Sequence, residues 1–555
     1  MVRLLSLLLC VGAVSARLRN PHDRHRPRAG PPSIARSLAD EHTHAPRAPE
    51  LPKRATTISF ANPKAAQYLV DGPRFPRSTL MSVRPGRVRL MPISGNANET
   101  RKLFFWFWPT TNEKHTDDLV FWTNGGPGCS SLEGLIQENG PFTWPTGTAK
   151  PIRNQWAWTN LSHVLWVEQP VGTGFSQGVP NITNEDQLAE QFAGFLAQFL
   201  EVFSELKGKN FYATGESYAG FYVPYIANYL YEHPKAVDLK LKGIWITDPS
   251  VSYDLVTEFI PAVNFAIPQL VFYLSDPTSW GQVRLHRLFQ EIRDLPPAGP
   301  LPLPSQSYVG SPDWAGIKDE CATWIMIYEA ASMVNPNFNV YRIFDVWPVL
   351  WMCSGFQVRD YTSLPSIKLA NDTYGNIGSF DSQQGPIYFN RTDVQDAIHA
   401  PHINWSECSS INVFVNGTDT SIPSMLSVMP NVIEKSERTV VMHGDIDYVL
   451  IAEGTRWHGQ QGFQRPIANE SFIIEGFGIL GAMHQERNLT YVEVDLSGHM
   501  MPLYAPWAAY KTLSYLLGRE ELTDHTNDAA LYPSAYELYG SASSKKVVNR
   551  HRTEL

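Results

Sequence analysis

The stretch Phe211-Tyr-Ala-Thr-Gly-Glu-Ser-Tyr-Ala-Gly220 indicates the fold of this 555-residue chain. Its first residues favour a strand, a form of the Gly-x-Ser-x-Gly pattern follows, and Tyr, Ile and Leu residues then recur at helical spacing. A sharp turn between a strand and a helix exposes the hydroxyl of its serine above a sheet. The stretch therefore predicts that Ser217 is the nucleophile of an α/β-hydrolase. The alternative is an ordinary turn rich in Gly and Ser.

Short apolar runs alternate with helical patterns from about residue 118 onward, as they do in parallel α/β folds. The clearest helix has apolar residues three and four apart between Leu188 and Phe203, which predicts a face packed on the core. The predicted fold is therefore an α/β-hydrolase with a mostly parallel central sheet. We expect its strands at Leu119–Trp122, Val164–Val167, Phe211–Ala213, Gly243–Ile246, Thr439–Met442 and Thr490–Val494.

Residues 250–430 interrupt this alternation with proline clusters, mixed helical stretches and turn signals. A large cap inserted into one α/β domain is the predicted explanation. The core would then consist of residues 55–249 and 431–525, followed by a C-terminal tail at 526–555.

The N-terminus has the pattern of a secretory signal peptide. Arg3 precedes the apolar run Leu4–Ala13, and small residues end the segment, so residues 1–16 are expected to be removed. Residues 17–54 are rich in Arg, His and Pro, lack an apolar period and end in a dibasic pair. They predict a propeptide, with a disordered tail that is never removed as the alternative.

Composition and charge exclude several classes of protein. The chain is 43% hydrophobic and 12% aromatic, which supports a large core, and its net charge is −9. Ten of the 45 Lys and Arg residues lie within residues 1–54, so the rest of the chain is more acidic still. An acidic surface argues against nucleic acid as a partner. No later apolar run is long enough to span a membrane, so we expect a soluble secreted or vacuolar protein.

Cysteines and sequons are informative in a secreted protein. Four cysteines remain beyond the signal peptide, and none has the spacing of a zinc site, so disulfides are expected in any of three pairings. These cysteines are Cys129, Cys321, Cys353 and Cys408.

Several Asn-x-Ser/Thr sequons are expected to carry glycans. The nine are Asn98, Asn160, Asn181, Asn371, Asn390, Asn404, Asn416, Asn469 and Asn488.

Two later segments carry the base and the acid that a nucleophilic serine needs. In α/β-hydrolases the acid and then the histidine follow the serine, each after a strand. Asp447 and His499 each follow a predicted strand in that order. Either residue alone is more often a surface or capping residue, so it is their joint order with Ser217 that predicts a triad. Asp445 is the alternative acid.

The sequence Trp122-Thr-Asn-Gly-Gly-Pro-Gly-Cys-Ser-Ser131 provides glycine amides directly after a predicted strand. Such amides can form an oxyanion hole. A phosphate-binding loop would instead end in Lys-Ser or Lys-Thr, which this stretch lacks.

Four motifs together resemble the serine carboxypeptidases of the carboxypeptidase Y type, including fungal secreted members. They are residues 122–131, Val167–Ser176, the segment around Ser217 and Gly498-His-Met500, within a resemblance that spans roughly residues 60–520. The resemblance implies the triad Ser217, Asp447 and His499. It also implies an oxyanion hole formed by the N–H groups of Gly126 and Tyr218.

The resemblance further implies a site for the free C-terminal carboxylate of a peptide, formed by Trp122, Asn124, Glu138 and Glu216. Two carboxyls in a low-dielectric site resist double ionisation, so in acid they keep protons and donate hydrogen bonds to the substrate. For Glu138 the alternative is a charge on a helix surface.

The same resemblance implies that Cys129 pairs with Cys408 and Cys321 with Cys353.

The resemblance also places Glu133 in the pocket for the departing side chain, where a carboxylate would favour Lys or Arg. The alternative for Glu133 is a solvated residue at a helix start. Leu450 and Met500 are expected to form an apolar wall. Thr123, Tyr448 and Leu450 stand where carboxypeptidase Y has Leu, Phe and Cys, which affects specificity and not the reaction.

The expected function is a serine carboxypeptidase that releases C-terminal amino acids from peptides at acidic pH through an acyl-enzyme. No metal or cofactor is expected. The alternatives are an acyltransferase or esterase on the same scaffold, and a non-catalytic binding protein. The carboxylate site discriminates between them, because an ester without a free carboxylate does not need it.

Overall fold

The structure is a computed structural model that describes residues 60–70, 86–144, 151–270, 322–334, 338–345, 388–456, 470–474 and 477–522. The chain divides into two compact units, Met1–Arg47 and Ala48–Leu555, and all described residues lie in the second. The predicted signal peptide, propeptide and C-terminal tail lie outside the described residues.

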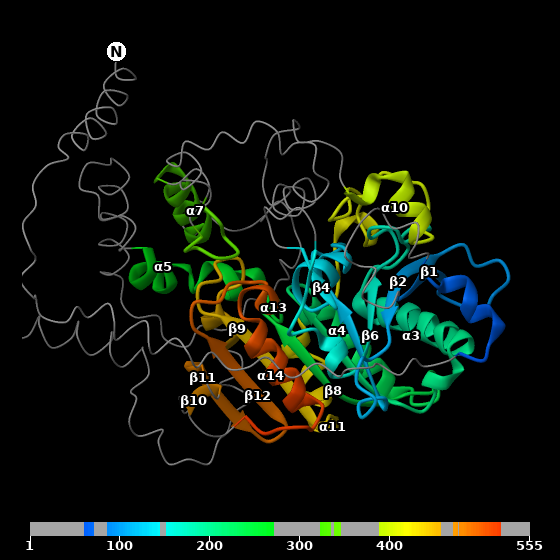
Figure 1. The fold of residues 1–555 in the computed structure, drawn as a ribbon. Coiled ribbons are helices and arrows are strands. Elements are labelled where there is room, and N and C mark those ends of the chain that lie inside the picture. Colours follow the sequence, from blue (N-terminus) through cyan, green and yellow to red (C-terminus); the bar gives the residue numbers. More distant parts are fainter. Residues whose placement is uncertain are drawn as a thin grey trace, which may run out of the picture. The chain divides into compact units, whose positions relative to one another are not determined.

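A ten-stranded sheet forms the centre of the described unit (Figure 1). The six middle strands pair in parallel, and two antiparallel strands follow at each edge. The predicted mostly parallel sheet is therefore confirmed. In spatial order the strands are β1 (Arg87–Pro92), β2 (Lys102–Trp108), β6 (His163–Glu168), β3 (Asp118–Thr123), β7 (Asn210–Glu216), β8 (Lys240–Thr247), β9 (Arg438–Gly444), β12 (Leu489–Val494), β11 (Gly478–Glu486) and β10 (Glu470–Ile474).

All six predicted strands are confirmed, because each lies within one of the six parallel strands. The four antiparallel edge strands were not predicted. A separate two-stranded sheet consists of β4 (Phe142–Thr143) and β5 (Ile152–Arg153).

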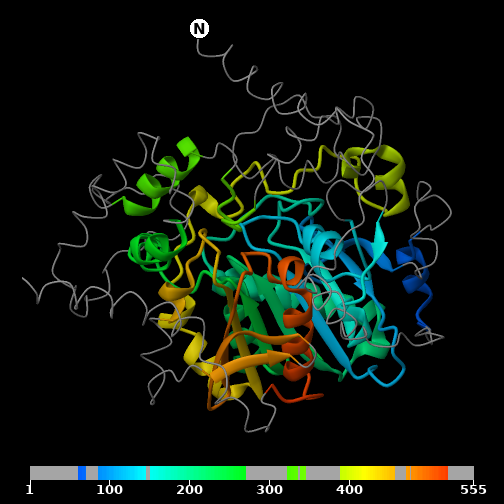
Figure 2. The same ribbon diagram turned by 60° about the vertical axis from the view of Figure 1, so that its left-hand side comes forward.

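Helices cover both faces of the sheet, because alternate residues of each strand point to opposite sides. On one face Phe121 and Phe211 pack with helices α3 (Glu185–Val202) and α4 (Ala219–Glu232). On the other face Trp122 and Trp245 pack with α14 (Pro506–Leu516), the orange-red helix along the strands in Figure 2. The remaining α-helices are α5 (Ala262–Leu270), α7 (Thr323–Val334), α10 (Thr392–Ala397), α11 (Met429–Lys435) and α13 (Met501–Tyr504).

Short 3₁₀ and π turns complete the described elements. Two are π-helical, η6 (Gly134–Glu138) and η9 (Leu255–Phe259). The 3₁₀ turns are η3 (Pro63–Tyr68), η7 (Trp158–Asn160), η8 (Ser204–Leu206), η12 (Tyr388–Asn390), η13 (Val415–Gly417) and η14 (Ser424–Leu426). No helix in the described part of the chain is both long and apolar enough to cross a membrane.

Helix α3 has the buried face that its sequence predicts. It begins after Asn184, whose side chain accepts the N–H of Gln187 at 3.0 Å. Its phenylalanines pack among aromatic residues of the neighbouring strands, and Phe199 is 0% exposed.

Between β8 and β9 the described residues include helices α5, α7 and α10 but no strand of the central sheet. Figures 1 and 2 both draw these helices at one end of the sheet. At that end the N–H of Ile343 donates to Ile446 O at 3.2 Å, and the N–H of His499 donates to Tyr341 O at 2.7 Å. Residues of the predicted cap therefore contact the loops after β9 and β12, while the boundaries of the cap stay a prediction.

Replacing Phe199 with Ala should destabilise the protein by about 3 to 5 kcal/mol, because it opens a cavity beneath the sheet. Chemical denaturation measures this loss. Glu190→Ala, an exposed position on the same helix, serves as the control and should change stability by less than about 0.5 kcal/mol. Equal effects of the two substitutions would contradict the packing of α3.

Candidate active site

Ser217 occupies the turn between strand β7 and helix α4. Its φ of 61° lies in the left-handed region, which residues with a side chain rarely adopt. Its N–H donates to Thr247 O at 3.0 Å, and its carbonyl accepts the N–H of Gly220 at 2.9 Å. An added Cβ on Gly220 would lie 2.2 Å from Ser250 O, so the turn requires glycine there. The turn thereby holds Ser217, which is half-buried, at the carboxyl end of β7.

Asp447 and His499 follow the neighbouring parallel strands β9 and β12. His499 Nδ1 lies 2.7 Å from Asp447 Oδ2, and both side chains are buried. Asp447 Oδ1 accepts the N–H of Val449 at 2.8 Å. The ring of Tyr341 packs edge-on against the imidazole of His499. The aspartate and the cap segment together fix the orientation of the ring.

The electrostatic surroundings distinguish the two candidate acids. Burial disfavours the charged form of His499, but the carboxylate of Asp447 raises the pKa of His499 above its ordinary value. Burial raises the pKa of Asp447 to about 6, although the charge and the hydrogen bond of His499 lower it. Burial raises the pKa of Asp445 to about 8, with a further contribution from Asp495. The structure therefore places Asp447, and not Asp445, against His499, and a carboxyl protonated at neutral pH is poorly suited to that position.

The glycine loop after β3 packs against the turn that holds Ser217. An added Cβ on Gly125 would lie 2.3 Å from Tyr218 N, so the two backbones are in direct contact. Gly126 has a φ of 115°, a conformation that favours glycine. The glycine loop and the amide of Tyr218 therefore lie beside Ser217.

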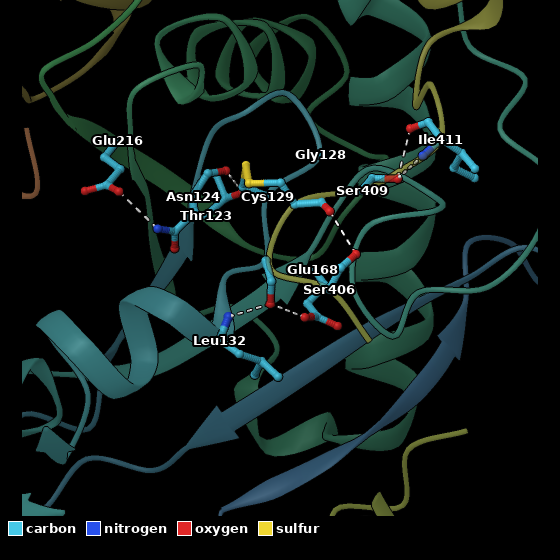
Figure 3. The surroundings of a disulfide bond; sticks show 12 residues. Thr123, Asn124, Gly128, Cys129, Leu132, Glu168, Glu216, Ser406, Ser409 and Ile411 are labelled. Atoms are coloured by element: carbon cyan, nitrogen blue, oxygen red, sulfur yellow. Dashed lines mark hydrogen bonds between the residues drawn. A yellow bond between two sulfur atoms is a disulfide. The ribbon is translucent and has the colours of Figure 1, made fainter. Parts of the chain in front are cut away.

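Asn124 links the four predicted carboxylate-binding residues. Its Nδ2 donates to Glu216 Oε1 at 3.0 Å (Figure 3). The same Nδ2 donates to Glu138 Oε1 at 3.5 Å, and Oδ1 accepts from Trp122 Nε1 at 2.8 Å. All four side chains are buried, so Glu138 is not a surface charge. The Oε2 atoms of both glutamates have no hydrogen-bond partner among the described residues. The two carboxyls also share a side-chain hydrogen bond, so the structure brings the four residues together around two buried and adjoining carboxyl groups.

Burial keeps these two glutamates protonated in acid. It raises the pKa of Glu138 to about 8, and the neighbouring Glu133 contributes to the shift. Burial, followed by the charge of Glu138, raises the pKa of Glu216 well above its ordinary value. Protonated carboxyls can donate hydrogen bonds to an anion, whereas ionised ones would repel it.

A disulfide joins Cys129 of the glycine loop to Cys408, as predicted (Figure 3). The N–H of Ser409 also donates to Gly128 O at 2.8 Å, so the two segments are joined by their backbones as well. The disulfide therefore joins a loop of the core to a segment of the predicted cap, next to the candidate active site. The other predicted pair, Cys321 and Cys353, lies outside the described residues.

Glu133 is buried beside a second acid that the sequence did not indicate. Its side chain is 9% exposed and hydrogen bonds to Glu407, which precedes Cys408. Burial raises the pKa of Glu133 to about 7. Glu133 is therefore not a solvated residue. Nothing in the local sequence marks Glu407, because its contact depends on the disulfide between distant segments.

Leu450 and Met500, the predicted apolar residues of the pocket, are both buried. The N–H of Leu450 lies 3.4 Å from Asp447 Oδ1, and Met500 directly follows His499. Both residues therefore lie next to the Asp447–His499 pair.

Among the described residues, one group of side chains has the spacing of a metal site. It consists of Asp248, His443 and Asp447. Its carboxylates are already engaged, Asp447 by His499 and Asp248 by the N–H of Gly444 at 2.7 Å. A metal would have to compete with the hydrogen bond that orients His499. The group fits the surroundings of a triad better than it fits a metal centre.

The predicted sequons differ in exposure. Asn160 is 8% exposed, and its Nδ2 donates to Gln155 O at 3.2 Å, so the folded protein leaves no room for a glycan there. Asn390 is partly buried. The exposed sequons are Asn98, Asn181, Asn404, Asn416 and Asn488, and those at Asn371 and Asn469 lie outside the described residues.

Known proteins match the chain over most of its length. The sequence model of the family described as serine carboxypeptidase matches residues 92–519. A probable serine carboxypeptidase of Arthroderma benhamiae is 40% identical over 508 residues, which cover 85% of this chain and 90% of that protein. Serine-type carboxypeptidase F of Aspergillus niger is 34% identical over 530 residues, or 88% of this chain and 93% of that protein.

A solved structure shows the same fold. Kex1(Δ)p, a prohormone-processing carboxypeptidase from Saccharomyces cerevisiae, superposes with a TM-score of 0.60 at 20% sequence identity. The match covers 83% of this chain and 98% of that chain.

Proposed function

The chain belongs to the serine carboxypeptidase family, and we propose that Ser217, His499 and Asp447 are its catalytic triad. Its reaction is the removal of C-terminal amino acids from peptides. One observation carries the proposal. Asp447 and His499 form a hydrogen bond of 2.7 Å at the carboxyl ends of the parallel strands, where the Ser217 turn also lies.

In the proposed mechanism, Ser217 Oγ attacks the carbonyl carbon of the last peptide bond and gives its proton to His499 Nε2. Ionised Asp447 stabilises the resulting imidazolium, and the N–H groups of Gly126 and Tyr218 stabilise the oxyanion. His499 then protonates the departing amino group, the C–N bond breaks and an acyl-enzyme forms. A water molecule deprotonated by His499 attacks the acyl carbon, which releases the shortened peptide and restores the serine.

We also propose that Trp122, Asn124, Glu138 and Glu216 form the receptor for the free carboxylate of the substrate. Asn124 and the protonated glutamates would supply the donors, and hydrogen bonds to an ionised carboxylate are stronger than neutral ones. An ester or amide without this carboxylate gains nothing from such donors. The receptor therefore favours an exopeptidase over an esterase or acyltransferase.

Glu133, with Leu450 and Met500, is proposed to line the pocket for the departing side chain. Its burial means that an ionised Glu133 would meet a basic side chain in a site with little water, where a charge-assisted hydrogen bond is worth about 1.5 to 3 kcal/mol. A broad specificity with a basic component follows.

The proposed route of the protein is the secretory pathway, to the extracellular space or the vacuole. The signal-like N-terminus, the disulfide of Cys129 and the exposed sequons support this route. The substrates would be the C-termini of peptides or proteins.

Ser217→Ala should lower kcat by at least about 10⁴-fold and leave the unfolding temperature unchanged, because the hydroxyl takes part in chemistry and not in core packing. A fluorophosphonate should label the wild type at Ser217 and fail to label the variant. Ser204→Ala, at an exposed serine, is the matched control and should behave as the wild type. Turnover by Ser217→Ala at the wild-type rate would rule out the triad.

The carboxylate receptor should give peptides and esters different pH profiles. Below about pH 8 Glu138 holds its proton, and above that pH it becomes an anion beside the substrate carboxylate. KM for peptides should therefore rise through this pH, while KM for esters without a free carboxylate stays level. Glu138→Gln cannot ionise and should flatten the peptide profile. Amidation of the peptide should raise KM roughly ten- to a hundredfold, and identical profiles for both substrate types would contradict the receptor.

Glu133→Ala should lower kcat/KM for peptides ending in Arg roughly tenfold more than for peptides ending in Leu. Because burial raises the pKa of Glu133 to about 7, the wild-type preference for Arg should grow as pH rises from acid to neutral. Glu133→Gln, which keeps the volume without the charge, should lose the same preference. Equal losses on both peptides would remove Glu133 from the pocket.

A further inference from the structure

Glu185 is a buried acid at the start of helix α3. It is the first residue of the helix and is 0% exposed. Its N–H donates to Ser421 Oγ at 2.7 Å, but neither of its carboxyl oxygens accepts a hydrogen bond from a donor in the described part of the chain. Buried polar groups are normally paired. The partner of this carboxyl must therefore be something other than a nearby N–H or hydroxyl group.

The partner is the carboxyl group of Asp419, a residue of the predicted cap that is 3% exposed. The side chains of Glu185 and Asp419 share a hydrogen bond, which is possible only if one of the two carboxyls holds a proton. Asp419 Oδ1 already accepts the N–H of Ser421 at 2.9 Å, and its Oδ2 accepts the hydroxyl of Tyr218 at 2.8 Å. Such donors stabilise an ionised carboxylate. The proton therefore belongs on Glu185.

The surrounding charges favour the same assignment. Burial raises the pKa of Glu185 well above its ordinary value, and the negative charges of Asp419 and Asp186 raise it further. Three nearby tyrosines stay neutral, since burial raises the pKa of each above its ordinary value. They are Tyr218, Tyr222 and Tyr225. These groups carry negative charge or none, which disfavours a second negative charge on the pair itself.

Backbone hydrogen bonds fix the segment that carries Asp419 against the residues before α3. The N–H of Val415 donates to Ile182 O at 2.8 Å, and the N–H of Thr420 donates to Thr183 O at 3.0 Å. The hydroxyl of Thr420 donates to the same Thr183 oxygen at 2.8 Å. Asp419 is therefore held in place independently of its own side-chain contacts.

Tyr218 connects the acid pair to the active site. It directly follows Ser217, and its N–H is one of the two proposed oxyanion donors. Its ring is buried and stacks on Phe221 with centroids 5.0 Å apart, while its hydroxyl ends on Asp419. One turn later, the hydroxyl of Tyr222 accepts the N–H of Gly128 in the glycine loop at 3.2 Å. Contacts at the face and at the tip of the Tyr218 ring thus restrain the backbone beside the nucleophile.

We propose that protonated Glu185 donates a hydrogen bond to ionised Asp419, and that this pair positions Tyr218 for its part in the oxyanion hole. Both acids are positioning residues, since they act through the hydroxyl of Tyr218 and do not touch the substrate. The inference rests on the function proposed above. It adds that the geometry of the oxyanion hole depends on a proton held at Glu185, which suits an enzyme that works in acid.

The pH dependence of stability tests the proton. Unfolded Glu185 releases its proton above about pH 4.3, whereas the folded protein keeps it, so unfolding becomes easier as pH rises. Glu185→Gln retains a donor for Asp419 and cannot ionise. Relative to the wild type, its folding equilibrium constant should rise by up to about tenfold per pH unit above about pH 5. Urea unfolding from about pH 5 to pH 7 measures this ratio. Glu190→Gln, at an exposed position of the same helix, is the control and should change the constant by less than about twofold.

The effect on the oxyanion hole is tested by kcat and KM at about pH 5. An ester substrate is used, because it avoids the titration of Glu138 and Glu216. Glu185→Ala should lower kcat roughly tenfold with KM little changed, because the oxyanion hole acts in the transition state, and Glu185→Gln should recover most of this loss. Tyr218→Phe, which lacks the hydroxyl, should lower kcat to a similar extent. Glu185→Ala added to Tyr218→Phe should cost little more, because the link is already broken.

Three outcomes overturn the proposal. They are a ratio of folding constants for Glu185→Gln that does not change with pH, a Glu185→Gln variant that fails to fold at about pH 5, and a double variant whose loss in kcat is the product of the single losses. If Glu185→Ala fails to fold, Tyr218→Phe decides: a lower kcat at constant KM supports the positioning, and an unchanged kcat overturns it. Ser217→Ala is the blank. Activity surviving there would discredit the triad, whereas a silent blank with an unchanged kcat in Tyr218→Phe discredits the acid pair alone.

Discussion

Parallel pairing of β7, β8, β9 and β12 is the constraint on which the active site depends. Parallel strands end at the same edge of a sheet, so the turns that follow these four strands meet there although they are far apart in sequence. The hydrogen-bond ladder continues past the strands, since Ser217 donates to Thr247 O and Asp248 donates to Met442 O. The sheet therefore fixes the backbones of the catalytic turns, and the bond from Asp447 to His499 fixes the side chains.

Burial of carboxyl groups at the carboxyl ends of the parallel strands has two opposite consequences for their protonation. Where a carboxyl has few donors, as in Glu138 and Glu216, burial raises its pKa and makes it a hydrogen-bond donor for an anionic substrate. Where a carboxylate must stay ionised, as in Asp447, it needs N–H donors and a balancing charge. One low-dielectric environment thus provides both a receptor for a carboxylate and a stable partner for the catalytic histidine.

The sequence predicted the middle of the fold and the residues that lie on recognisable motifs. The six parallel strands are buried on both faces and therefore read as continuous apolar runs, whereas β11 mixes apolar, polar and glycine residues and was not predicted. The apolar strand β2 was also missed, although it reads as a buried run. Burial of Glu138 and the link through Asn124 agree with expectations carried by motifs. Glu407 and Tyr341 were missed, because their contacts come from the disulfide and the cap segment. Local sequence carries no information on such long-range contacts.

The protonation of Glu138 and Glu216 can be measured directly by infrared difference spectroscopy, with the Glu138→Gln and Glu216→Gln variants used to assign the carboxyl bands. If burial makes these residues the receptor for the substrate carboxylate, the carbonyl stretch of a protonated carboxyl should be present in acid and at neutral pH. For Glu138 it should disappear as the pH rises through about 8. Bands of ionised carboxylates from both residues at about pH 5 would contradict the proposed receptor.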